Sequence, residues 1–159
     1  MMTCTRNIRK RRTSAGSILV DVVLGMFFFL VFALTFAALY PVIKRAEVMS
    51  SQESKAVQMT SRLIEHIQML PVQDINATSL TALNLIEPGQ TAQPWKFSKI
   101  PLDQAARYSP DQVLKNANGT ITTELLSGGS VKVNVNLTYT AVSGKTKTVK
   151  AYTVVGSFR

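Results

Sequence analysis

The sequence predicts an α+β protein in which a long N-terminal helix packs on a C-terminal antiparallel sheet. The first half of that helix is expected to cross a membrane, because residues 18–40 form an almost uninterrupted apolar run. No Pro or Gly occurs from Val42 to Leu70, so a helix can continue beyond this run. Apolar and polar side chains alternate with period two over residues 131–140, which predicts a strand with one buried face.

Residues 1–16 have the composition of a targeting segment rather than of folded structure. They contain five basic side chains and no acid, at Arg6, Arg9, Lys10, Arg11 and Arg12. An ordinary secretory signal peptide is the alternative interpretation. Its apolar core spans only ~7–15 residues, whereas this run is longer, and residues 37–40 make a poor cleavage context. The sequence therefore favours a leader that precedes a true transmembrane helix.

The apolar run has the length of a membrane span. The twenty-three residues from Ile18 to Tyr40 extend roughly 35 Å as a helix, against ~30 Å of hydrocarbon. Asp21 is the only charged residue among them. A carboxylate at the centre of a span costs about 2.5–3.5 kcal/mol on insertion scales, and less near an interface. Intramembrane acids usually have a partner or a function, which marks Asp21 as a candidate site.

A basic leader, Gly16, Ser17 and an acid at the fifth position after Gly16 occur here at fixed spacing. This arrangement resembles the prepilin-type cleavage and methylation signature of type IV pilins and pseudopilins. The resemblance implies that a prepilin peptidase cleaves between Gly16 and Ser17, leaving residues 17–159, and methylates the new amino terminus at Ser17. It also implies that Asp21 pairs with the amino terminus of a neighbouring subunit. Family members mostly have Glu at the position of Asp21 and often Phe at that of Ser17.

After the span, residues 41–70 are expected to form an amphipathic helix that enters the head. Pro41 predicts a local kink. A stripe in steps of four and three follows at Val42, Ala46, Met49, Glu53, Ala56, Thr60, Leu63, Ile67 and Leu70. From Ala56 onward Val57, Met59 and Ile64 widen its apolar face, so residues 42–55 are predicted to be a solvated stalk or bundle contact and 56–70 to pack on the head. Residues 60–71 also resemble the helix end of minor pilins of the pilus-modification type.

Residues 71–159 are predicted to form the globular head. Residues 71–118 are expected to be loops with short elements: a strand at 95–100 with Trp95 and Phe97 on one face, a helical turn at 103–108, and a short helix from Ser109 through Leu114.

Strands at 121–126, 131–140 and 146–155, joined by turns at 127–130 and 143–145, are expected to form a meander over residues 120–156. The half-helix 56–70, a strand from 72–118, or both are expected to cover it.

Composition narrows the classes of function. The net charge is +9, but residues 17–159 carry 13 basic and 9 acidic side chains, or +4, which is no evidence for nucleic-acid binding. The only cysteine, Cys4, lies in the leader, and the only histidine, His66, is expected at the helix surface. No catalytic constellation, cofactor site or metal site is apparent, so we expect a protein that is not an enzyme. Lys145, Lys147 and Lys150 are predicted to form a solvated edge, with contact to DNA or to an acidic surface as the alternative.

The function expected from these features is that of a minor pilin or pseudopilin in a type IV pilus or type II secretion-like filament. A competence system remains open. Its partners would be the prepilin peptidase, other subunits contacted through the N-terminal helix, and an inner-membrane assembly platform. The basic leader predicts a single-pass protein of the cytoplasmic membrane with its head outside the cytoplasm. The alternatives are a membrane-anchored binding domain that does not polymerise and a DNA-uptake pilin.

Overall fold

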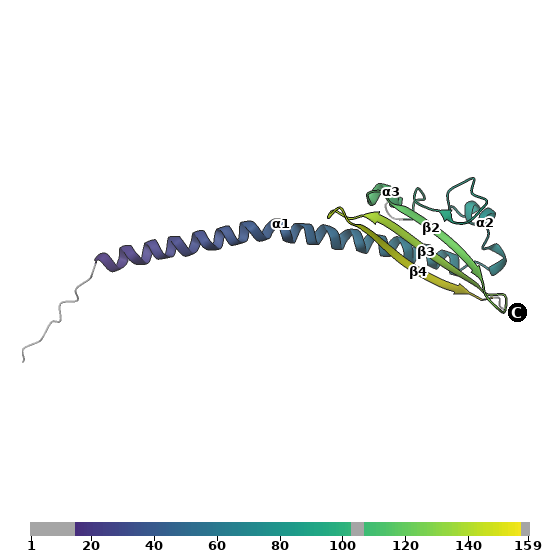
Figure 1. The fold of residues 1–159 in the computed structure, drawn as a ribbon, viewed down its shortest axis with the longest axis horizontal. Coiled ribbons are helices and arrows are strands. Elements are labelled where there is room, and N and C mark those ends of the chain that lie inside the picture. The colour runs from purple at the N-terminus through teal and green to yellow at the C-terminus, as the bar shows by residue number, and fades with distance from the viewer. Residues whose placement is uncertain (1–14, 103–106, 157–159) are drawn as a thin grey trace, which may run out of the picture. The chain divides into compact units, whose positions relative to one another are not determined.

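The computed structural model describes residues 15–102 and 107–156. The chain divides into two units, Met1–Ile43 and Lys44–Arg159, which are treated separately below. In chain order the elements are α1 (Ala15–Gln68), the 3-10 helix η1 (Val72–Asp74), α2 (Ala77–Ala82), β1 (Trp95–Lys96), α3 (Pro110–Val113), β2 (Asn118–Leu125), β3 (Val131–Thr140) and β4 (Thr146–Val155) (Figure 1).

The expected long helix is confirmed as one element, α1, of 54 residues. It continues through Pro41, which has no backbone N–H to donate to the carbonyl of Ala37. The helix ends at Gln68, shortly before Pro71. Proline restricts the residue that precedes it to extended conformations, so the sequence itself stops the helix there.

Four strands form one antiparallel sheet in the order β1-β2-β3-β4. The predicted bounds of β3 and β4 are confirmed. β2 begins at Asn118 rather than Ile121, because the far end of β3 provides pairing partners for Asn118 and Gly119. The β2–β3 turn contains Gly128 and Gly129 at φ values of 95° and 77°, a conformation that glycine adopts without steric cost.

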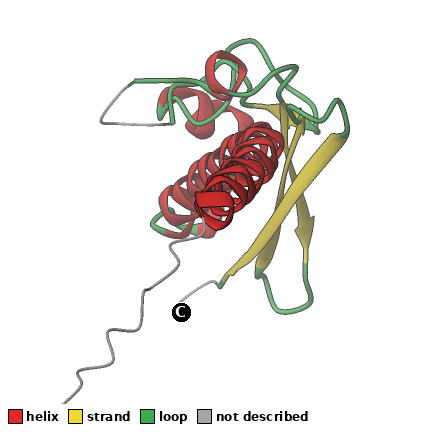
Figure 2. Cartoon of the chain, turned by 90° about the vertical axis from the view of Figure 1, so that its left-hand side faces the viewer, coloured by secondary structure: helices red, strands yellow, loops and turns green. Residues whose placement is uncertain are grey.

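The C-terminal part of α1 lies against one face of the sheet (Figure 2). In β3 every odd-numbered side chain is buried and every even-numbered one is partly exposed. Burial in α1 begins at Ala56, as expected, and continues through Met59, Thr60, Leu63 and Ile67. Val57 differs from the prediction, because its side chain is 46 % exposed. One residue along a helix turns the side chain by ~100°, which moves Val57 from the buried stripe to the flank.

Both expected covers of the sheet are present. β1 adds to the edge of β2, with Trp95 opposite Ile121, while α1 covers the inner face. Trp95 and Phe97 are both buried, as predicted. The strand itself has only two residues instead of spanning 95–100. The backbone turns there, because the N–H of Ile100 donates to the carbonyl of Phe97 at 3.1 Å.

The short helix α3 confirms the expectation for the segment after Ser109. The Ser109 N–H donates to the side chain of Gln112 at 3.2 Å, which caps the helix. The sequence did not identify α2, whose first turn is capped by Asn76 accepting from the N–H of Ser79 at 2.9 Å. The helical turn expected over residues 103–108 falls largely outside the described residues.

Gly119 is predicted to be intolerant of any side chain. A Cβ atom there would lie 2.5 Å from the ring of Phe97, which is fully buried. We expect Gly119→Ala to lower the free energy of unfolding by about 1–3 kcal/mol through overpacking. Gly156→Ala is the matched control, since its Cβ would meet only Ser130 Oγ at 3.9 Å. Denaturant titration of the full chain in detergent measures both, and equal stability of the two variants would contradict this packing.

Candidate functional site

The apolar half of α1 has no protein cover in the described structure. Every side chain from Ile18 to Ile43 is exposed, with Phe29 at 73 % and Phe36 at 71 %. Monomeric soluble proteins rarely expose a continuous apolar surface of this extent. In the part of the chain that is described, α1 is the one helix long and apolar enough to cross a membrane. This surface requires lipid or other helices around it.

Asp21 is the only charge on this apolar surface and is exposed. It follows Ser17 by four residues, so the two positions share one helix face and are separated by about 6 Å along the axis. Gly25 lies one turn further on, and a Cβ added there would meet nothing within 4 Å. The hydroxyl of Thr35 is satisfied locally, since it donates to the carbonyl of Val31 at 2.7 Å. Asp21 is therefore the polar group on this surface that most needs an external partner.

The predicted cleavage site lies among the first described residues of α1. Ala15 is the first of them, and the backbone of Gly16 and Ser17 is helical. The basic cluster over residues 6–12 lies outside the described residues. The positions of Ser17 and Asp21 are four residues apart in this helix and therefore lie on one face.

The end of the apolar surface is marked by Tyr40 and then by Lys44 and Arg45. Aromatic and cationic residues commonly flank a span at the membrane–water interface. Lys44 Nζ lies 2.8 Å from Glu47 Oε2, and this hydrogen bond lowers the pKa of the Glu47 carboxyl. Both side chains are exposed, so the pair marks the start of the solvated part of α1 rather than a strong contact.

Three polar contacts attach α1 to β4 and the turn before it. Lys147 Nζ lies 2.6 Å from Glu53 Oε2, and Gln68 Nε2 donates to Thr153 Oγ1 at 2.7 Å. The N–H of Val142 donates to Gln52 Oε1 at 3.3 Å. The hydrogen bond to Glu53, with the attraction of that carboxylate, raises the pKa of the Lys147 ammonium. These contacts hold both ends of β4, and the turn before it, on the helix.

The prediction of a basic run along the last strand is corrected by this geometry. Lys147 shares the inner face with Val149 and Val155 and pairs with Glu53, whereas Lys150 is exposed on the other face. Alternation along a strand separates odd from even positions, so the lysines do not form one cationic surface. His66 is exposed on α1, as expected. The described residues include no group of three His, Cys, Asp or Glu that could hold a metal.

Tyr139 lies beside the Glu53–Lys147 pair, directly opposite Lys147 in the sheet register. Its hydroxyl is buried and has no hydrogen-bond partner among the described residues. Burial raises the pKa of this phenol, Lys147 lowers it, and Glu53 raises it further. Sequence analysis did not identify this cluster, because Glu53 is ninety-four residues from Lys147 in the chain.

Comparison of the chain with models of protein families, with curated proteins and with solved structures gives no match in any of the three. The candidate site therefore rests on its own geometry: an apolar helix surface, one acid on it, and Gly16 and Ser17 in the same helix.

Replacing Tyr139 with Phe is predicted to leave stability at pH 7 unchanged or to raise it by up to about 1 kcal/mol, since the buried hydroxyl gains no partner on folding. The raised pKa adds a pH dependence. Above pH 10, Tyr139 ionises in the unfolded chain before it does so in the folded chain, so stability falls as the pH rises.

Tyr139→Phe should lose less stability in this alkaline range than the wild type. Lys147 contributes to the stability of both proteins. In both, this contribution is lost as the pH rises through the raised pKa of the Lys147 ammonium. Denaturant titrations at neutral and alkaline pH measure the difference. Tyr152→Phe is the control, because the Tyr152 ring is 73 % exposed. A loss of stability in Tyr139→Phe at pH 7 would show that the hydroxyl has a partner.

Proposed function

We propose that the chain is a structural subunit, a minor pilin or pseudopilin, of a type IV pilus or type II secretion-like filament. The observation that carries the proposal is Asp21, the single acid on the exposed apolar part of α1 from Ile18 to Ile43, four residues beyond Ser17. An anchor that merely holds a domain at a membrane gains nothing from an acid at this position. A subunit that recognises another subunit inside a membrane does.

Charge pairing gives the physical reason. Cleavage after Gly16 would create an ammonium group at Ser17 in an apolar environment, one helical turn from Asp21 of the same chain. An unpaired carboxylate and an unpaired ammonium each cost free energy there. Neighbouring helices displaced along a common axis bring the amino group of one copy level with Asp21 of the next, and the pair relieves both costs. Asp reaches about one methylene less far than Glu, so the helices must approach closely.

The head supports the same proposal. A long helix whose C-terminal part covers an antiparallel sheet is the arrangement expected of a pilin-like fold, and α1 with β1–β4 has this α+β layout. The apolar residues from Val22 to Phe36 would exchange lipid for contacts with like helices, and Gly25 permits a close approach of backbones. The head would lie outside the cytoplasm, because the cluster of basic residues precedes the span.

Processing is the first test. Mass spectrometry of the chain produced with and without a prepilin peptidase should show loss of residues 1–16 and a methylated Ser17 only when the peptidase is present. A Gly16→Leu variant should remain intact in both cases, because its side chain obstructs the bond to be cleaved. An intact Met1 terminus under both conditions would instead support the membrane-anchored binding domain that does not polymerise.

Replacement of Asp21 is the second test. Asp21→Ala and Asp21→Asn should be processed and inserted normally, yet their incorporation into filaments should fall at least about tenfold, the factor for each ~1.4 kcal/mol of lost pairing. Asp21→Glu restores the charge with a longer reach and should incorporate at least as well as the wild type. Immunoblots of sheared filaments against membrane fractions measure the ratio. Normal incorporation of Asp21→Asn would remove charge pairing from the mechanism.

A further inference from the structure

β4 forms one edge of the sheet, and the described part of the chain places no strand beyond it. It has ten residues, contains no proline, and pairs with β3 without a bulge from Val131↔Val155 to Thr140↔Thr146. Proteins usually blunt long edge strands with prolines, bulges or inward charges, because an open edge is a template for another strand. The one inward charge on β4, Lys147, is already paired with Glu53.

The hydrogen-bond register identifies the free backbone groups of this edge. The N–H of Ala141 donates to the carbonyl of Lys145 at 2.9 Å, which continues the register of β3 with β4. Odd-numbered residues of β4 therefore form the hydrogen-bonded pairs with β3, and the N–H and C=O groups of even-numbered residues point away from the sheet. These residues are Thr146, Thr148, Lys150, Tyr152 and Val154. An added strand would find a regular series of donors and acceptors.

A groove lies beside this edge on the side of α1. It has a volume of ≈ 580 Å³, and its lining includes Met49, Glu53 and Val57 of α1 together with Lys147 of β4. Glu53 and Gln68 both contact β4, so this flank of α1 lies next to the open edge. A strand paired with β4 would continue the sheet over the groove. Every second side chain would face Val57 and Met49, where small apolar groups gain free energy on burial.

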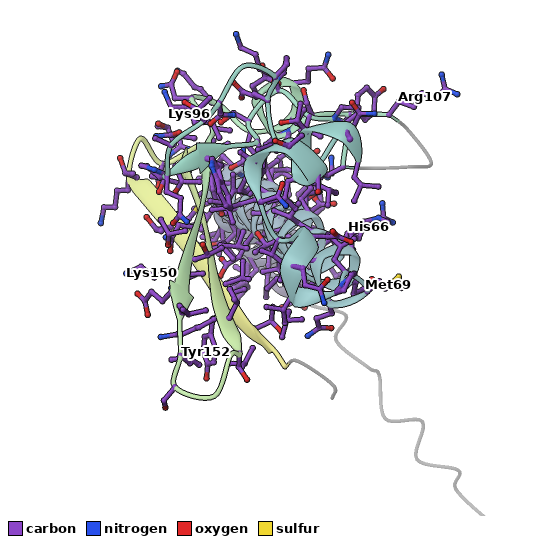
Figure 3. The ribbon with its side chains drawn as sticks, turned by 90° about the vertical axis from the view of Figure 1, so that its right-hand side faces the viewer. His66, Met69, Lys96, Arg107, Lys150 and Tyr152 are labelled. Atoms are coloured by element: carbon purple, nitrogen blue, oxygen red, sulfur yellow. The ribbon has the colours of Figure 1, made fainter. Side chains whose placement is uncertain are left out.

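The opposite face beside the edge is positively charged. Lys150 lies on this face, is exposed and has no ion-pair partner among the described residues, and β4 contains no acid. Figure 3 shows Lys150 and Tyr152 on the sheet side of the head, away from His66. Lys132, on the neighbouring strand, forms a long, exposed ion pair with Glu124, in which Nζ and Oε2 are 3.8 Å apart. Directly opposite and diagonal positions interact across strands, so acids on this face of a partner would be attracted to Lys150.

We infer that the edge of β4 binds an extended acidic segment of a protein partner by strand addition. The partner places acids on the face of Lys150 and small apolar side chains over the groove of Val57. A second copy is a poorer occupant, since two β4 edges bring lysines together and supply no free acid. The inference uses only the unit Lys44–Arg159, so it does not depend on filament assembly.

The probe for the test is a fluorescent ten-residue peptide in which valine and glutamate alternate. Anisotropy should show saturable binding to the full chain in detergent micelles and none to empty micelles. A peptide with the same composition in two blocks should bind at least about tenfold more weakly, because it cannot present one apolar and one acidic face. A peptide alternating valine and lysine should not bind. Bound peptide should slow hydrogen exchange of the free amides in β4.

Thr148→Pro removes a free N–H from the edge without removing a backbone hydrogen bond to β3, and it should weaken binding at least about tenfold. It also removes the side-chain hydrogen bond between Thr148 and Thr138 at 3.1 Å, which Thr148→Val removes as well. Thr148→Val, which keeps the N–H, is the matched control and should bind like the wild type. Lys150→Gln should weaken binding about two- to fivefold and reduce its salt dependence. Circular dichroism checks folding. If Thr148→Pro does not fold, Val57→Glu tests the groove from an exposed position on α1.

Equal binding of the peptide to wild type, Thr148→Pro and Val57→Glu would overturn the inference. So would preference for the lysine peptide or for duplex DNA over the glutamate peptide. Self-association of the chain that Thr148→Pro abolishes, without binding of the acidic peptide, would assign the edge to a second copy and likewise overturn it.

Discussion

One helix carries two kinds of surface, and the core of the head depends on where one changes to the other. From Ile18 to Ile43 α1 exposes side chains all round, and from Ala56 to Ile67 it buries one stripe. Residues 44–55, between these two segments, carry enough polar side chains to be exposed to water. Because the helix is continuous, the head has only the last four turns on which to build a core, and the sheet must lie along them.

The parts of the fold that the sequence predicted are those with strong periodicity. Period two over residues 131–140 and the stripe from Ala56 to Ile67 each repeat often enough to specify an element and its buried face. Weakly periodic parts were predicted less well. α2, which depends on a single cap at Asn76, was missed, and β1 was predicted too long, since only two of its residues pair with β2. Val57 was misplaced, because the width of a buried stripe depends on what packs against it.

Glu53 and Lys147 show why site geometry is harder to predict than the elements that carry it. Each is a polar residue on an otherwise apolar pattern, Glu53 in the helical stripe and Lys147 on the inner face of β4. Either one alone suggests a solvated position. They are ninety-four residues apart in the chain and 2.6 Å apart in the fold. Only the packing of β4 on α1 shows that the two residues form an ion pair, which accounts for the charged side chain at each position.

The position of this pair also explains the open flank of the head. Glu53 lies three residues before Ala56, where burial of α1 begins, so the pair closes the end of the core with a polar contact. β4 is the edge strand of the sheet and contacts α1 through Lys147 and Thr153, and Val57 of α1 is exposed. An apolar side chain such as Val57 beside an unpaired strand edge is costly to leave in water. The surface of the head at the edge of β4 is therefore apolar on the side of α1 and cationic on the side of solvent.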